Sequence, residues 1–168
     1  VDADNYTEQA IEALSEIDTT SLHIDVVIGA QHPSCEQIKA ICMQQEFICH
    51  VQTDRMAELM MDADLSIGAG GSATWERCCL GLPSLNICVA ENQRDQINDA
   101  AQEGYIYAPT ANDDLTVVIK NHVRALLEND HLRQMLSRNG KRAVDGRGVL
   151  RVIGHMGCSG IAIRLANL

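Results

Sequence analysis

Short apolar runs alternate with segments of helical periodicity along most of the chain, and this alternation limits the fold more than any other feature. The runs have the length and composition of buried strands and cover residues 25–29, 47–51, 64–68, 84–89 and 105–107. Short strands that are separated by helices pair in parallel through right-handed crossovers. The sequence therefore predicts an α/β protein with a Rossmann-like, doubly wound parallel sheet.

Helices are expected between these strands. The first should begin at Asn5, which would cap it, with Glu8 three residues on as in a capping box. The segment 72–80 has helical spacing and ends before Gly81, Leu82 and Pro83. A further stripe with spacings of three and four predicts a helix that packs on the core through Leu115, Val118, Ile119, Val123, Leu126 and Leu127.

Length and composition fit one domain with an aliphatic core. The chain has 168 residues, of which 46% are hydrophobic and only 3% aromatic, so Ile, Leu, Val, Ala and Met should fill the space between sheet and helices. We expect residues 1–157 to form this domain and residues 158–168 to be a linker or the start of another. Because Val1 stands almost at a helix start, we also expect the strand and turn that open such a fold to be missing from this sequence.

The charge of the chain excludes some partners. A formal net charge of −10 and a pI near 4.9 are unlike a nucleic-acid-binding face, which needs clustered Lys and Arg. An anionic ligand would have to be held locally by backbone N–H groups and helix N-termini. No run approaches the roughly 18 apolar residues of a membrane span, and the first residues are no signal peptide, so we expect no membrane partner and a cytoplasmic protein.

The cysteines favour reduced thiols over a metal site. Seven cysteines are present without a C-x-x-C pair, which suits free thiols in a reducing compartment. A zinc cluster could draw on the histidines and cysteines of residues 32–50, but structural zinc sites usually pair their ligands at close spacing. The sequence predicts neither a metal nor a cofactor.

The turn 68–72, with the sequence Gly-Ala-Gly-Gly-Ser, is the strongest candidate for a ligand site. It joins a predicted strand to a helix at the sheet end where ligands of open α/β folds bind. Gly70 and Gly71 would let a phosphate approach the backbone, and the hydroxyls of Ser72 and Thr74 stand beside the free amides of the helix. A tight turn without a ligand is the alternative.

Two further groups of polar residues lie near this turn in the predicted fold. Glu76 follows Ser72 by one helical turn, and its carboxylate could accept both hydroxyls of a ribose, with compensation of the helix dipole as the alternative. The polar segment 91–98 follows the fourth strand, where its amides could hold a sugar or a phosphate. A solvated helix start capped by Asn92 explains that segment equally well.

Residues 63–84, followed by Glu91-Asn92-Gln93, resemble the UDP-2,4-diacetamido-2,4,6-trideoxy-β-L-altropyranose hydrolases of pseudaminic acid biosynthesis. They are more distantly similar to the UDP-N-acetylglucosamine transferase of peptidoglycan synthesis, which has the GT-B architecture. The resemblance extends to about Gly157. It implies that the chain is the nucleotide-binding, C-terminal half of a GT-B enzyme.

The resemblance also implies roles for individual residues. It assigns the diphosphate of UDP or a UDP-sugar to Gly70, Gly71, Ser72 and Thr74, the ribose to Glu76, the uracil to the backbone near Val51, and the sugar or phosphate side to Asn92 and Gln93. The family's catalytic histidine belongs to the N-terminal domain, and none of the six histidines here has such a context. The intact enzyme would release UDP by attack of water on the anomeric carbon, and this chain alone would bind a nucleotide without catalysis.

Three other functions stay open. A UDP-sugar glycosyltransferase would use the same nucleotide site and differ in the missing domain. An NAD-dependent oxidoreductase would fit the spacing Gly68-x-Gly70-x-x-Ala73 with Glu91 further on, although that fingerprint normally follows the first strand of its domain. A non-enzymatic interaction module would bind no nucleotide.

Overall fold

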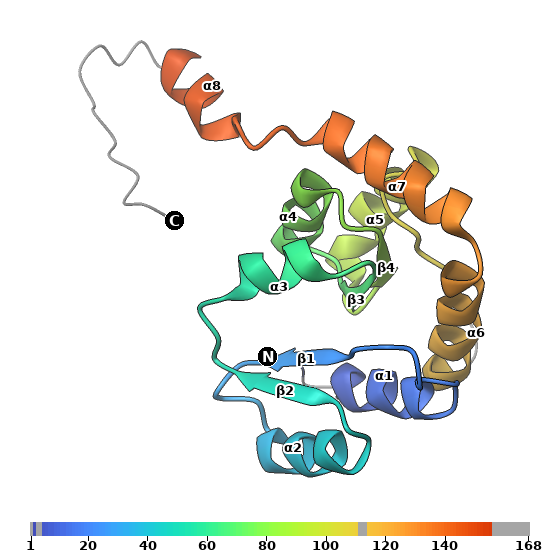
Figure 1. The fold of residues 1–168 in the computed structure, drawn as a ribbon. Helices are drawn as coiled ribbons and strands as arrows, with labels where there is room; N and C mark the ends of the chain where they lie inside the picture. The colour runs from blue at the N-terminus through green and yellow to red at the C-terminus, as the bar shows by residue number, and fades with distance from the viewer. Residues whose placement is uncertain (1, 3–4, 111–113, 156–168) are drawn as a thin grey trace.

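The computed structural model describes residue 2 and residues 5–110 and 114–155. Its elements run in the order α1 (Tyr6–Ser15), β1 (Asp25–Ile28), α2 (Cys35–Gln44), β2 (Ile48–Val51), α3 (Met56–Asp62), β3 (Ser66–Ala69), α4 (Ser72–Leu80), β4 (Ser84–Ile87), η1 (Glu91–Gln93), α5 (Arg94–Gln102), α6 (Leu115–Leu127), α7 (Asp130–Ala143) and α8 (Gly148–His155). Strands and helices alternate as far as α5, and the last three helices then follow one another (Figure 1). The expected linker or further domain at 158–168 lies outside the described residues.

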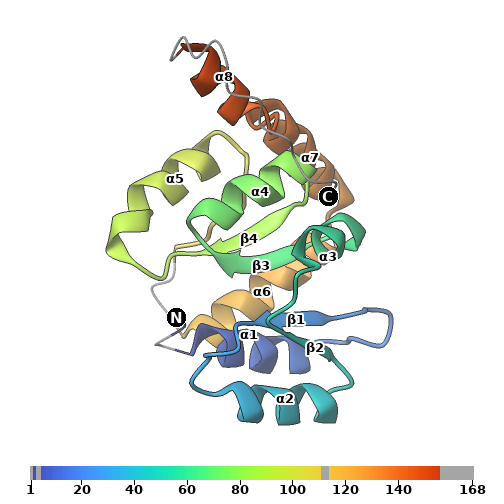
Figure 2. The same ribbon diagram turned by 90° about the vertical axis from the view of Figure 1, so that its left-hand side faces the viewer.

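The strands form two parallel pairs. β1 pairs with β2 in a register that sets Asp25 opposite Ile48, and β3 pairs with β4 with Ser66 opposite Ser84. Parallel pairing with helical crossovers confirms the predicted α/β, Rossmann-like class. The sheet is nevertheless divided, because β1 and β3 share no ladder in the described part of the chain. Figures 1 and 2 show β1 lying between β2 and the β3–β4 pair, so the crossover through α3 carries the chain past β1.

The expected fifth strand at residues 105–107 is reduced to a single bridge. The N–H of Asn86 donates to the carbonyl of Tyr107 at 2.8 Å, and the N–H of Tyr107 donates to the carbonyl of Ser84 at 2.9 Å. Tyr107 thereby forms a parallel bridge beside Leu85. Pro109 follows closely and has no N–H with which to extend a ladder.

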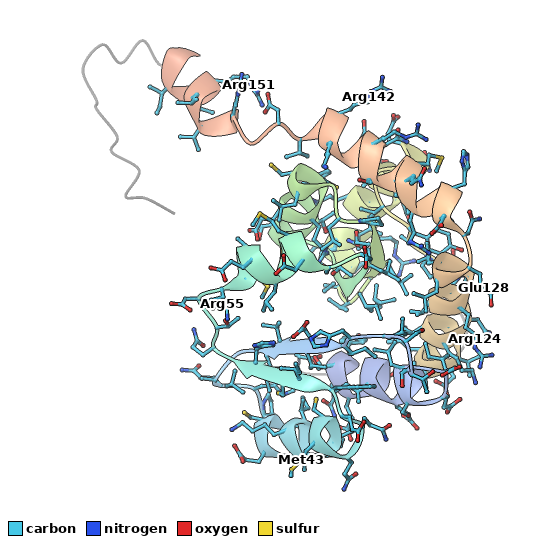
Figure 3. All side chains as sticks on the ribbon, viewed as in Figure 1. Met43, Arg55, Arg124, Glu128, Arg142 and Arg151 are labelled. Carbon is cyan, nitrogen blue, oxygen red and sulfur yellow. The ribbon has the colours of Figure 1, made fainter. Side chains whose placement is uncertain are left out.

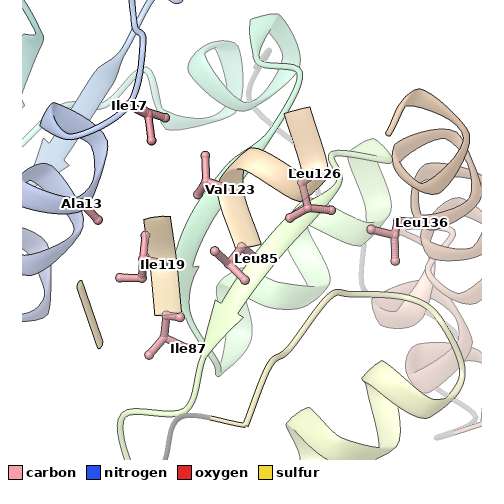
Figure 4. Close-up of a cluster of buried hydrophobic side chains, with 8 residues drawn as sticks. All are labelled: Ala13, Ile17, Leu85, Ile87, Ile119, Val123, Leu126 and Leu136. Atoms are coloured by element: carbon pink, nitrogen blue, oxygen red, sulfur yellow. The ribbon is translucent and has the colours of Figure 1, made fainter. Parts of the chain in front are cut away.

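Helix α1 joins the two strand pairs through two apolar clusters. One cluster links α1 to β4, α6 and α7 and consists of Ala13, Ile17, Leu85, Ile87, Ile119, Val123, Leu126 and Leu136 (Figure 4). The other links Ile11 of α1 to Val26 of β1 and Ile38 of α2. Because α1 belongs to both, burial of the two clusters fixes the strand pairs relative to each other. The α6 members also confirm the predicted apolar stripe of that helix.

The predicted cap of α1 is wrong. Asn5 has a left-handed φ of 56° and makes no side-chain cap bond, and its side-chain amide instead donates to Glu8. The carboxylate of Asp2 accepts the N–H groups of Tyr6 and Thr7, each at 2.8 Å. An acid four residues before the helix therefore satisfies the first-turn donors that the capping box was expected to serve.

The last two helices, α7 and α8, were not expected from the sequence. α7 packs on α4 at Gly140, where a Cβ would lie 3.2 Å from the Cα of Cys78, so glycine permits the close approach. α8 extends away from the body in Figure 1 and exposes Val149, Leu150 and Val152. The helices of the described ranges are all too short or too polar to cross a lipid bilayer.

Candidate functional site

The turn between β3 and α4 presents backbone donors at the carboxyl end of β3. Gly71 is the residue before the first helical residue and has φ 104° and ψ −159°, a conformation that residues with a Cβ rarely adopt. Within the described part of the chain, no side chain caps α4. The N–H of Thr74 donates to the carbonyl of Gly71 at 3.1 Å. The N–H groups before it, at the start of the helix, have no acceptor inside the helix and are directed out of its end. The turn thus has the form expected of an anion-binding loop.

The segment that follows β4 closes on this turn. A Cβ at Gly70 would lie 2.6 Å from Cδ1 of Ile97 and 3.1 Å from Oε1 of Gln93. A Cβ at Gly71 would lie 3.6 Å from Nε2 of Gln93. The structure therefore brings the side-chain amide of Gln93 close to Gly70 and Gly71, three residues that the sequence analysis assigned to one ligand site.

Ser72, Glu76 and Asn92 are exposed around the turn. Glu76 lies one turn along α4 from Ser72 and forms no hydrogen bond or ion pair with any residue that the structure describes. Asn92 belongs to the short 3-10 helix η1, which leads into α5, and it does not cap α5, so the expected cap by Asn92 is wrong. Both side chains are accessible to a ligand.

Thr74 and Val51 are less favourably placed. Thr74 is 2% exposed, and its Oγ1 accepts the side-chain amide of Asn86 at 2.8 Å and Nη2 of Arg77 at 3.4 Å. Its hydroxyl faces the interior behind the turn. Val51 ends β2, in the strand pair that does not contain the glycine turn. The assignments of Thr74 to the diphosphate and of Val51 to the uracil stay predictions.

The side chain that sequence reasoning missed is Arg77. It is 4% exposed, donates from Nη2 to the carbonyl of Ala69 at 2.9 Å, and has its pKa lowered by burial. Nothing in the local pattern distinguishes it from a surface arginine of an amphipathic helix. Its Nε has no hydrogen-bond partner among the described residues, and neither have two other buried atoms, Oγ of Ser84 and Oδ1 of Asn86 in β4.

Other surfaces offer weaker sites. A hollow of about 360 Å³ is lined by Asp64, Pro83 and Arg133 among others, but Asp64 and Pro83 precede β3 and β4, so it opens at the opposite strand ends from the glycine turn. The described residues contain no group of three His, Cys, Asp or Glu side chains that could hold a metal. The arginines labelled in Figure 3 lie on or beside different helices. The expectation that the chain binds no nucleic acid stays a prediction.

Residues 1–144 match the glycosyltransferase family 28 C-terminal domain. The chain belongs to this family. It is 29% identical over 130 residues to the spore coat polysaccharide biosynthesis protein SpsG of Bacillus subtilis (strain 168), which covers 75% of this chain and 38% of that protein. The chain thus spans well under half of this curated relative.

Solved structures confirm the fold. MurG of Acinetobacter baumannii is similar with a TM-score of 0.71 at 16% identity, over 94% of this chain and 49% of that one. WaaG, a glycosyltransferase involved in lipopolysaccharide biosynthesis, has a TM-score of 0.67 at 19% identity, over 89% and 41%. A protein of Listeria monocytogenes that is described as a candidate UDP-N-acetylglucosamine 2-epimerase has a TM-score of 0.67 at 14% identity, over 90% of this chain and 40% of that one. The predicted GT-B-type, C-terminal fold is correct.

Proposed function

We propose that the turn 68–72 and the start of α4 bind the diphosphate of a UDP-sugar, and that the full-length protein is a sugar-nucleotide enzyme. The membership in glycosyltransferase family 28 carries this proposal. The uncapped start of α4 behind Gly71 supports it, because a helix end of this kind stabilises an anion by about 0.3–1 kcal/mol when exposed and up to about 2 kcal/mol when partly buried. The Listeria relative, whose name includes UDP-N-acetylglucosamine, supports the uridine nucleotide.

Individual roles follow from accessibility. Ser72 and Gln93 would add a hydroxyl and an amide N–H to the backbone donors of the turn. Glu76, which is exposed and unpaired among the described residues, would accept the ribose hydroxyls. Asn92 would face the sugar.

Transfer of the sugar to an acceptor is the reaction that the comparisons favour, since the family and WaaG are both glycosyltransferases by description. Hydrolysis of the UDP-sugar in pseudaminic acid biosynthesis is the second candidate, and the resemblance of residues 63–84 supports it. UDP leaves as a stable anion in both reactions, so this chain would contribute preorganised donors rather than a general acid. The catalytic base would belong to another domain. Binding of NAD gains no support, because β3 is the third strand here and not the first.

A UDP-release assay on the full-length protein separates these reactions. Release of UDP from UDP-sugars only in the presence of an acceptor supports a transferase. Release into water without an acceptor supports a hydrolase. Absence of release under both conditions, together with no binding of UDP, would contradict the proposed function.

Glu76 provides the sharpest test of the nucleotide site. We predict that Glu76→Ala weakens UDP binding by about 1.5–3 kcal/mol, or roughly ten- to a hundredfold, because two hydrogen bonds to a carboxylate are lost. Glu12→Ala is the matched control, since Glu12 is an exposed glutamate on α1. Isothermal titration calorimetry measures both variants. Equal dissociation constants for the two would remove Glu76 from the site.

A further inference from the structure

Arg77 is a buried cation that forms no ion pair with any of the described residues. Its side chain is 4% exposed, and the ion pairs of the described residues all involve other basic groups. Its contacts are with neutral oxygens, those of the Ala69 carbonyl and the Thr74 hydroxyl, and its Nε has no partner. Arginine stays protonated in proteins near neutral pH, so the charge is present there.

The guanidinium lies directly behind the glycine turn. A Cβ at Gly68 would be 2.6 Å from Nη1 of Arg77 and 3.4 Å from its Cζ, so the glycine leaves room for the cation at the end of β3. The hydrogen bond from Nη2 holds the carbonyl of Ala69 toward this buried group. That carbonyl is therefore not directed at an anion bound by the amides of the turn.

The location of this charge matters because the rest of the protein repels anions. The chain carries a formal net charge of −10, and a field of that sign lowers the local concentration of a diphosphate. Burying a charge that has no ion-pair partner lowers the stability of the folded protein. An anion at the turn would offset that cost, because charges interact strongly where water is excluded.

We propose that Arg77 is a fixed counter-charge behind the glycine turn, which positions the turn and favours diphosphate ligands over neutral ones. The inference rests on the proposed nucleotide binding and adds the source of its selectivity for charge. Arg77 is a positioning residue, since it acts through the backbone of Gly68 and Ala69 and through its electric field. Its loss should weaken UDP binding more than uridine binding.

The test measures the binding of uridine, UMP and UDP to the protein by isothermal titration calorimetry, with Arg77→Gln and Arg77→Lys as variants. Both substitutions remove the planar guanidinium, but only lysine keeps the charge. We expect Arg77→Gln to reduce the ratio of UDP to uridine affinity about tenfold, which corresponds to about 1.4 kcal/mol. Arg77→Lys should retain most of this ratio. Arg55→Gln removes an exposed arginine at the start of α3 and should leave the ratio unchanged.

The possible results are distinct. An unchanged ratio in Arg77→Gln, or equal losses for uridine and UDP, overturns the inference and leaves Arg77 a structural residue. If circular dichroism shows that Arg77→Gln does not fold, Gly68→Ala takes its place, because the added Cβ displaces the guanidinium without changing the charge. An unchanged ratio in that variant also overturns the inference. Failure of the wild-type protein to bind UDP would instead refute the proposed function.

Discussion

Gly70 offers a direct test of how the turn is packed. A Cβ at this position would meet Cδ1 of Ile97 at 2.6 Å and Cγ1 at 2.9 Å, and Ile97 is only 4% exposed. Overpacking of a buried site costs about 1–3 kcal/mol. Replacing a glycine by alanine where the backbone permits it returns about 0.4–1 kcal/mol through the unfolded chain. We therefore predict that Gly70→Ala lowers the free energy of unfolding by roughly 0.5–2 kcal/mol, the difference between these two effects.

A double-mutant cycle identifies the responsible contact. Ile97→Val deletes Cδ1, the atom nearest to the new methyl group, and by itself should cost about 0.5–1.5 kcal/mol. In the double variant the deleted methyl group makes room for the added one. The loss in free energy of unfolding should therefore be smaller than the sum of the two single losses. We expect a favourable coupling of about 0.5–1.5 kcal/mol.

Urea denaturation followed by circular dichroism measures the four proteins of the cycle. Gly29→Ala is the control for the substitution itself, because a Cβ at Gly29 would meet nothing within 4 Å. Strict additivity of Gly70→Ala and Ile97→Val, or a Gly70→Ala variant as stable as the wild type, would refute the reasoning that segment 91–97 closes tightly on the turn.

Two further predictions concern stability. Burial alone would raise the pKa of Asp2, but hydrogen bonds from the first turn of α1 and from His32 outweigh it and lower the pKa. Because the folded-state pKa is lowered, the stabilisation is present above the unfolded value of about 3.9 and is lost as the pH falls through the folded value. Asp2→Ala should thus cost about 0.5–2 kcal/mol at pH 7, and melting curves should converge with those of the wild type in acid. Tyr107→Phe removes the 2.9 Å bond to Nδ1 of His122 but keeps the ring contact, so chemical denaturation should show a loss of about 0.5–1.5 kcal/mol, and an unchanged midpoint would contradict this.

The parts of the fold that depend on local signals could be predicted. α4 runs from Ser72 to Leu80 as expected, because glycines bound it on both sides. Gly71 has φ 104° before the helix, and Gly81 has φ 71° after it and bonds back to the carbonyl of Cys78. Both conformations favour glycine, so the residue type alone fixes the ends of the helix.

Features that depend on distant contacts could not be predicted. The acid that caps α1 is Asp2, and it is held by His32, which is far away in the sequence. Gly140 lowers the helix propensity of α7, and only its approach to Cys78 explains why a glycine stands inside a helix. The burial of Arg77 likewise depends on how α4 lies against β3, which no spacing along the chain specifies.

The gap between the β1–β2 pair and the β3–β4 pair lies beside the strand that leads into the glycine turn. The N–H of Ile48 bonds the carbonyl of Ile24, and that of Ser66 bonds the carbonyl of Pro83. Since alternate residues of a strand face opposite edges, the main-chain groups of Val27 and Ile67 face away from their partner strands. One parallel strand between β1 and β3 would satisfy both edges and give the order β2, β1, added strand, β3, β4. Ligands of doubly wound sheets bind where the strand order reverses, and in that order the reversal falls beside β3, at whose carboxyl end the glycine turn begins.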